Sequence, residues 1–317
     1  MDGFRIPVGS WAETGVDWIR DNLGGLLDAI AVIVRFLVGG LTDVLIGSPI
    51  VGVIVVAALL GWLVRSWKLA VGAVVGFALI LAMGQWVTAM QTLALVLVAT
   101  VVAVAISVPL GIWSARNDTV RAILKPVLDF MQTMPAFVYL IPAITFFSIG
   151  VVPGVVSTVI FALPPGVRLT ELGIRGVDAE TVEAGHAFGA TRGQILRGIQ
   201  LPLAMPTIMA GVNQVIMLAL SMAVVAGIVG ADGLGKEVVE SISTVNLAKG
   251  VEAGLSVVIL AVYLDRLTAA LGTPSEHRSS LLGVVRRRRA AASAAQPDAA
   301  AAATAESAAD RQPVGAR

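Results

Sequence analysis

Long stretches of this chain contain no Asp, Glu, Lys or Arg, and these charge-free runs restrict its fold more than any other feature. The runs cover 44–64, 69–115, 130–167 and 198–231. A charged side chain is costly in hydrocarbon and a span needs about 20 apolar residues, so the runs predict one, two, two and one spans. A seventh span is expected at about 251–271. The predicted fold is an all-α polytopic membrane protein with about seven transmembrane helices.

The predicted turns lie where glycine and proline interrupt the two longest runs. One falls near Gly84-Gln85-Trp86 and the other at 150–154. The whole chain is 57% hydrophobic and 14% charged, which leaves no room for a large soluble domain. It has no Cys and only two His, so we expect neither disulfides nor a metal site. No nucleic-acid partner is expected either.

The basic residues are distributed unequally between the predicted loops. One side of the membrane collects 17 of the 22 Lys and Arg residues, and the other side holds Arg5, Arg20, Arg35, Lys236 and Lys249. Cytoplasmic loops are enriched in Lys and Arg. The N-terminus is therefore predicted outside and the C-terminus in the cytoplasm of a multi-pass protein of the cell (inner or plasma) membrane.

The two ends of the chain differ from the predicted spans. Residues 1–46 do not resemble a signal peptide, and apolar residues at steps of three and four between Val16 and Val44 predict an external amphipathic, interfacial helix. The alternative is an eighth span through Asp28 and Arg35. Residues 273–317 are predicted to be a basic, then Ala-rich, disordered cytoplasmic tail. Within it, Arg286–Arg289 are a topology signal or, alternatively, a sensor of anionic lipid or ionic strength.

The longest polar insertion between spans, 168–202, predicts two short helices at an angle. Asp178 is the expected N-cap of a helix through Phe188, and Gly189 ends that helix in the left-handed conformation. Thr191 and Gln194 form a capping box that starts a second helix. Pro202 is expected to close the second helix from beyond its end.

This insertion resembles the EAA loop of binding-protein-dependent ABC importer permeases. The matching residues are Glu183-Ala184-Gly185, then Gly189, then Ile199-Gln200-Leu201-Pro202, with Gly185 in place of the family's second Ala. Three further stretches, 131–142, 160–165 and 233–238, are similar to the glycine betaine/proline (quaternary amine) branch of that family. The resemblance covers roughly 45–272.

The resemblance implies a transport subunit rather than an enzyme. Residues 47–272 would form the permease domain, with 168–202 as a cytoplasmic coupling loop. Glu183 and Ala184 would lie on the helix that docks on a separate ATPase subunit, Gly189 would set the bend, and Pro202 would begin the sixth span. No cofactor would bind this chain, since ATP and Mg would be held by the ATPase subunits. The other implied partners are an external substrate-binding protein, a second permease copy and membrane lipid, and the implied substrates are osmoprotectants such as glycine betaine, proline betaine or choline.

Two further patterns have competing interpretations. The segment 230–236 has phosphate-loop spacing, but Glu237 replaces the expected Ser or Thr and no strand precedes it, so Gly233 and Gly235 are predicted to form an external glycine turn where the binding protein docks. Asn213, Gln214, Met217 and Ser221 are candidates for lining the pathway, although polar residues in spans also hydrogen-bond neighbouring helices.

The remaining functional alternatives are an ABC permease for another small solute and, from a different class, an ion-coupled secondary carrier or channel. No well-buried ionisable residue is predicted within the spans, and the carboxylates are expected in loops. Ion-coupled carriers place ionisable groups toward an internal cavity. The sequence therefore favours energy supplied by a partner.

Overall fold

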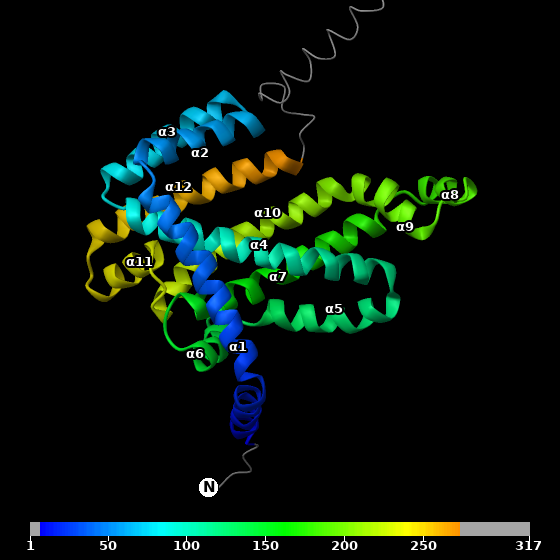
Figure 1. Cartoon of the computed structure of the whole chain (residues 1–317), viewed down its shortest axis with the longest axis horizontal. Helices are drawn as coiled ribbons and strands as arrows, with labels where there is room; N and C mark the ends of the chain where they lie inside the picture. The colour runs from blue at the N-terminus through cyan, green and yellow to red at the C-terminus, as the bar shows by residue number, and fades with distance from the viewer. Residues whose placement is uncertain (1–6, 273–317) are drawn as a thin grey trace, which may run out of the picture.

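A computed structural model describes residues 7–272, and every regular element in that range is a helix (Figure 1). The prediction of an all-α chain is confirmed. The predicted tail 273–317, with Arg286–Arg289, lies outside the described residues. The elements, in chain order, are α1 (Val8–Gly47), α2 (Ile50–Val64), α3 (Trp67–Ala82), α4 (Trp86–Arg116), α5 (Asp118–Thr133), η1 (Ala136–Tyr139), α6 (Leu140–Phe147), α7 (Val151–Arg175), α8 (Ala179–Ala187), α9 (Arg192–Ile195), η2 (Leu196–Gln200), α10 (Leu201–Ala226), η3 (Gly227–Val229), α11 (Leu234–Ser243) and α12 (Leu247–Gly272).

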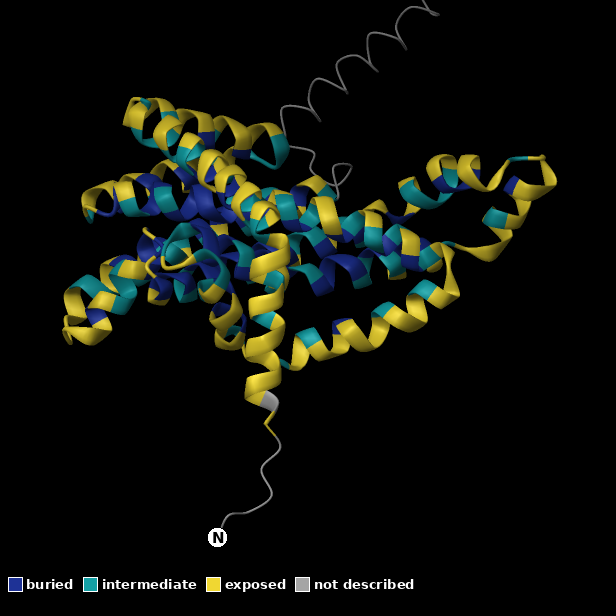
Figure 2. Ribbon diagram, turned by 60° about the horizontal axis from the view of Figure 1, so that its bottom comes forward, coloured by how far each residue is buried: buried dark blue, intermediate teal, exposed yellow. Residues whose placement is uncertain are grey.

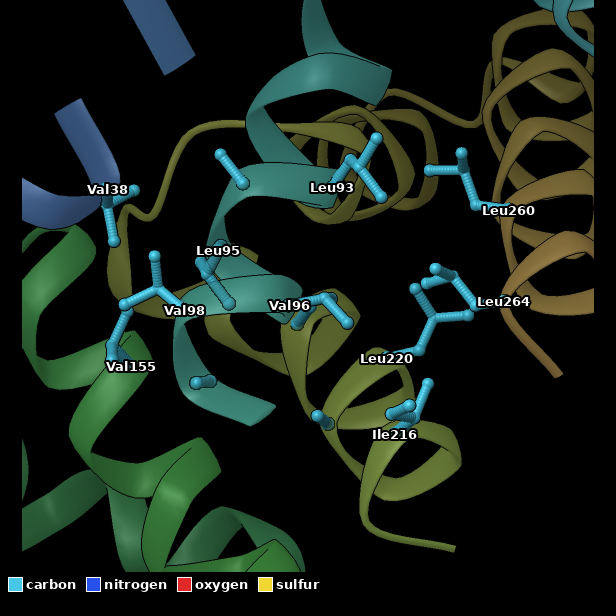
Figure 3. Packing of buried hydrophobic residues seen from close by; sticks show 14 of the residues in the cluster. Val38, Leu93, Leu95, Val96, Val98, Val155, Ile216, Leu220, Leu260 and Leu264 are labelled. Carbon is cyan, nitrogen blue, oxygen red and sulfur yellow. The ribbon is translucent and has the colours of Figure 1, made fainter. Parts of the chain in front are cut away.

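The core lies between three long helices, α4, α7 and α10, which pack along much of their length, with α12 against α10 (Figure 1). In Figure 3, Val98 of α4 meets Val155 of α7, and Leu220 of α10 faces Leu264 of α12. Buried residues concentrate in this core, whereas α5 and the N-terminal half of α1 are mostly exposed (Figure 2). The core helices therefore form the framework on which the other elements are placed.

Glycines allow the core helices to approach closely. A Cβ added at Gly166 of α7 would lie 2.4 Å from the Ser107 Oγ of α4, and one at Gly111 of α4 would lie 2.7 Å from the Val167 carbonyl oxygen. In hydrocarbon there is little hydrophobic drive between helices, so close packing at small residues supplies much of their association. These contacts hold α4 and α7 together as one unit.

About seven spans are predicted, and five helices of the described range, or six with one bent pair, are long and apolar enough to cross a membrane; one of them is α1, which is not among the predicted spans. Within residues 7–272 the five are α1, α4, α7, α12 and the continuous helix Arg192–Val229, and the bent pair is α5 and α6. α2 and α3 have 15 and 16 residues, shorter than the about 20 of an upright span. The turn predicted near Gly84-Gln85-Trp86 is confirmed, because α3 ends at Ala82 and α4 begins at Trp86.

The region predicted as the fourth span is not one straight helix. Its helix, α5, already begins at Asp118, and the chain bends by 109° between α5 and the segment Ala136–Phe147. The bend lies at Met134, whose extended backbone (ψ 133°) precedes Pro135, a position where the proline ring disfavours helix. The next turn lies at 148–150, so the turn predicted at 150–154 is correct only at Gly150, because α7 already starts at Val151.

Helix α1 runs across the direction of α4, α7 and α10 rather than along it (Figures 1 and 2). Its fully buried residues, Ala31, Val34 and Val38, lie in its C-terminal half and join the core cluster. The helix is also long and apolar enough to span. Its crosswise direction favours the interfacial interpretation over an eighth span parallel to the others, and that interpretation stays a prediction.

Candidate functional site

The insertion 168–202 projects from one end of the bundle, where α8 and α9 lie apart from the core (Figures 1 and 2). The predicted caps of α8 are confirmed. The Asp178 carboxylate accepts a hydrogen bond from the Thr181 N–H (3.0 Å), and Gly189 has a left-handed φ of 78°. The Ala190 N–H donates to the Gly185 carbonyl (3.1 Å), which closes the end of the helix. The bend after α8 is thus defined by local backbone geometry.

The capping box of α9 is also confirmed, but the predicted end of that helix is wrong. The Gln194 N–H donates to Thr191 Oγ1 (3.4 Å), and the Thr191 N–H donates to Gln194 Oε1 (2.8 Å). Pro202 does not terminate α9, because the π-helical turn η2 carries the helix directly into α10. Pro202 lies in the first turn of α10, where a missing N–H is tolerated. That it begins the sixth span stays a prediction, because the helix is continuous from Arg192 to Val229.

The two short helices cross at Gly185. This residue is buried, and a Cβ there would lie 2.7 Å from Cδ1 of Ile199 and 3.4 Å from Cγ1 of Ile195. The half-buried Leu201 follows at the start of α10 and packs against the cluster of Ile174 and Leu196. The residue type at position 185 therefore sets how closely α8 lies on η2.

The opposite side of α8 is exposed. Glu183, Ala184 and His186 are all exposed, and the Phe188 side chain is 92% exposed. The sequence interpretation missed Phe188 as a site residue, although a large aromatic at the C-cap of a polar helix was a readable signal. An exposed aromatic beside a carboxylate is suited to contact with another protein.

The four pathway candidates of α10 do not share one face. Gln214, Met217 and Ser221 lie on an exposed face, while Asn213 turns toward α12. The Asn213 amide donates to Asp265 Oδ1 (2.9 Å) and accepts from Thr268 Oγ1 (2.6 Å). Asn213 thus links α10 to α12 by hydrogen bonds, which was the alternative to lining the pathway.

A charged cluster at the end of α7 was not predicted. The charge pattern places Glu171 in a loop that starts at Arg168, but α7 continues to Arg175. The side chain of Glu171 is only 16% exposed and contacts Arg121, Arg175 and Ser114. Glu171, a partly buried carboxylate that contacts three helices, is therefore an additional candidate for a functional residue.

The glycine turn lies at the opposite end of the bundle and packs closely on the core. The Leu234 N–H donates a hydrogen bond to Thr92 Oγ1 (2.8 Å). Gly233 has a φ of 125°, and a Cβ on it would lie only 2.5 Å from the same Thr92 Oγ1. Gly235 was predicted to be part of the turn but lies in the first turn of α11, and a Cβ there would lie 2.5 Å from the Ala223 carbonyl oxygen. These glycines serve helix packing, which agrees with rejecting a phosphate loop.

Ion pairs join the two helices that follow this turn. Lys249 Nζ lies 2.8 Å from a Glu237 carboxylate oxygen and 3.0 Å from one of Glu240. Within residues 7–272, no three His, Asp or Glu side chains gather as ligands of a metal ion.

Comparisons with known proteins agree over most of the chain. The family model "Binding-protein-dependent transport system inner membrane component" matches residues 107–273. The glycine betaine transport system permease protein OpuAB of Bacillus subtilis is 47% identical over 276 residues, which are 87% of this chain and 98% of that protein. The glycine betaine/proline betaine permease protein ProW of Escherichia coli is 46% identical over 87% of this chain and 78% of its own length.

A solved structure shares the fold. The MetNI methionine ABC transporter in an inward-facing conformation has a TM-score of 0.55 at 22% identity, over 58% of this chain and 93% of the matched chain. The family match and the two permeases cover the bundle together with the projecting segment. The chain belongs to the family of binding-protein-dependent transport system inner membrane components and is a multi-pass permease subunit of an ABC transporter.

Proposed function

We propose that this permease imports glycine betaine and related osmoprotectants such as proline betaine or choline. The observation that carries the proposal is the similarity to glycine betaine permeases from two organisms, at 46–47% identity over 87% of the chain. A third relative, the glycine betaine/carnitine permease protein GbuB of Listeria monocytogenes, is 47% identical over 84% of the chain. The shared element of these names is a quaternary ammonium substrate.

The coupling loop is proposed to dock on a separate ATPase subunit, which holds ATP and Mg. Its exposed face, with Glu183, Ala184 and Phe188, is the side of α8 that would enter the ATPase surface. α9, η2 and α10 form one continuous helix, so movement of the loop would be carried directly into the membrane. ATP hydrolysis would in this way alternate the access of the pathway.

The assembly is proposed to contain two copies of this permease, two ATPase subunits and an external substrate-binding protein. The exposed face of α10 with Gln214, Met217 and Ser221 is the proposed pathway lining, and a second copy would enclose it. The weakly polar character of this face suits a passage that does not retain its substrate. The binding protein would dock at the end that carries Gly233 and Gly235.

The proposed orientation places the coupling loop in the cytoplasm and the N-terminus outside. Basic residues at the ends of α2, α4 and α12 support it: Arg65 donates a hydrogen bond to the Arg266 carbonyl (3.3 Å), so these two predicted cytoplasmic residues share one end. A reporter fused before Asp2 tests the orientation. A cytoplasmic signal from that reporter would contradict it.

Uptake in proteoliposomes tests the function. The permease is purified with its ATPase and reconstituted with the binding protein and internal ATP, and uptake of labelled glycine betaine is measured with and without vanadate. We expect vanadate-sensitive uptake that excess unlabelled proline betaine or choline reduces. Uptake of a different small solute alone would support the first alternative. Uptake without an ATPase that stops when an ion gradient is dissipated would support a carrier.

A further inference from the structure

Helix α5 is attached to the bundle by charge rather than by apolar packing. Its only fully buried side chain is Leu128, and the helix lies along α7 with most of its surface exposed (Figure 2). Three ion pairs connect it to α7: Arg121 with Glu171 (2.8 Å), Arg168 with Asp129, and Arg175 with Asp118 (2.6 Å). This attachment differs from the close glycine contacts between α4 and α7.

Glu171 connects three helices through one carboxylate. Its Oε2 accepts a hydrogen bond from Ser114 Oγ of α4 (2.7 Å), while its Oε1 lies 2.8 Å from Arg121 Nε of α5 and 3.6 Å from Arg175 Nε of α7. Arg175 also donates to the Ser114 carbonyl (3.0 Å) and to Asp118 Oδ1 (2.6 Å). The Glu171 side chain is 16% exposed, although that of its partner Arg121 is 49% exposed, so water screens the Glu171 carboxylate less than the Asp129 carboxylate, which is 52% exposed.

The position of Glu171 in the chain gives this carboxylate a mechanical role. It lies one turn before the end of α7, and α8 starts at Ala179, four residues beyond that end. On its other side the coupling loop continues without a break into α10. Glu171 is therefore the polar connection through which movement of the loop on the α7 side reaches α5.

The space between α5 and α7 permits relative movement. An open cleft of about 310 Å³ lies between these helices, lined by Arg121, Lys125, Arg168 and Glu171 among others. The cleft leaves room for α5 to shift relative to α7. Helix α4 has no such room, because it packs closely on the glycines of α7. Three connections fix this end of α5 to the core: the contacts of Glu171, the Arg175–Asp118 pair, and the chain link to α4 through Asn117. Of these, the contacts of Glu171 are the ones made inside the bundle by a side chain that is mostly buried.

We propose that Glu171 is a positioning residue that makes α5 follow the coupling loop during the transport cycle. The proposal rests on the proposed function, because it assumes that an ATPase moves this loop. Beyond the bend at Pro135, α5 continues into η1 and α6 at the other end of the bundle. A displacement of α5 would therefore be passed to η1 and α6, where Leu140 packs with Met222 of α10.

The test compares Glu171→Gln with Asp129→Asn in the complete complex with ATPase subunits and binding protein. Glutamine keeps the size of the side chain and removes its charge. We expect about a tenfold fall in substrate imported per ATP hydrolysed for Glu171→Gln, the scale of coupling between linked sites. Asp129→Asn removes the exposed ion pair between the same helices and is expected to change this ratio less than about twofold.

A distance measurement reports the role directly. The chain contains no cysteine, so spin labels can be placed at Ile123→Cys of α5 and Leu172→Cys of α7, two exposed positions. With Glu171 present, the distance between the labels should stay the same when the complex is trapped with ATP and vanadate. In Glu171→Gln the distance should broaden or change on trapping.

The outcomes distinguish failure of the proposed role of Glu171 from failure of the proposed transport function. An unchanged import ratio in Glu171→Gln, equal losses in both variants, or an unchanged label distance together with lost coupling would overturn the role of Glu171. Thermal unfolding of each complex shows whether a variant is folded, and the label distance can be measured even if transport is lost. If the unmodified complex imports no glycine betaine with ATP, the proposed function fails instead.

Discussion

Gly189 offers a test of whether backbone geometry at the bend controls coupling. Its φ of 78° lies in the left-handed region, and nothing lies within 4 Å of the place where a Cβ would be. A substitution here therefore meets no steric obstacle, and its cost comes from the backbone alone. Residues with a Cβ lose about 1–2 kcal/mol in this conformation, and a β-branched residue lies at the upper end or beyond.

The fraction of loops that keep the native bend is expected to fall in the order Gly189→Asn, Gly189→Ala, Gly189→Val. At about 2 kcal/mol, Gly189→Val would reduce the fraction of loops with the native bend roughly 30-fold relative to the alternatives, since 1.4 kcal/mol is a factor of ten. Asn tolerates the left-handed region and should remain near the parent. The predicted consequence is weaker binding of the ATPase and less substrate imported per ATP, with unchanged stability of the spans.

The assay is uptake and ATP hydrolysis in proteoliposomes for the three variants, together with retention of the ATPase during purification. Parental uptake by Gly189→Val would refute the idea that the bend positions the docking helix. Equal losses for Asn and Val would refute the backbone explanation in a different way, because they would assign the effect to contact between the new side chain and the ATPase.

Substitutions at three further contacts test packing, each by thermal unfolding of the purified complex. Gly185→Ala requires only a rotation of the Ile199 side chain and should be tolerated. Gly185→Leu should lower the free energy of unfolding by about 1–3 kcal/mol and release α8 from η2. Equal effects of the two substitutions would contradict the close crossing at Gly185. Thr92→Val removes the acceptor for the first N–H of α11 and should cost about 1–3 kcal/mol, while Thr92→Ser should not; a stable Val variant would contradict that hydrogen bond. Gly166→Ala should destabilise the α4–α7 contact by about 1–3 kcal/mol and be partly restored by Ser107→Gly, and no restoration would contradict the close approach of the two helices at this point.

The local features of the coupling loop were predictable because their causes lie within a few residues. The N-cap of α8 needs only Asp178 and the N–H of Thr181, and the capping box needs only Thr191 and Gln194. The turn between α3 and α4 followed from the length of a charge-free run. In each case the physical constraint and the sequence signal occupy the same short segment.

The features that the sequence did not reveal depend on partners far along the chain. Counting charges ends a span at Arg168 because charges are costly in hydrocarbon, but α7 continues past it and α5 supplies Asp129 as a counter-charge. Likewise Asn213 and Gln214 are neighbours in sequence, but a helix turns about 100° per residue, so one meets α12 and the other does not. The bend before Pro135 did have a signal in the sequence, the proline itself, but a count of charged residues does not take prolines into account.

The uneven packing of the bundle indicates where alternating access has to occur. A Cβ at Gly111, Gly166 or Gly211 would clash with a neighbouring core helix, so α4, α7 and α10 cannot slide past one another without losing those contacts. Movement of the coupling loop, which connects α7 to α10, therefore displaces these three helices as one unit. By contrast, α5 is held to α7 by ion pairs and a single buried leucine, and to α4 by the chain link at Asn117. Since ion pairs can break and re-form with little rearrangement of the core, the contacts of Glu171 are where coupling would be lost first.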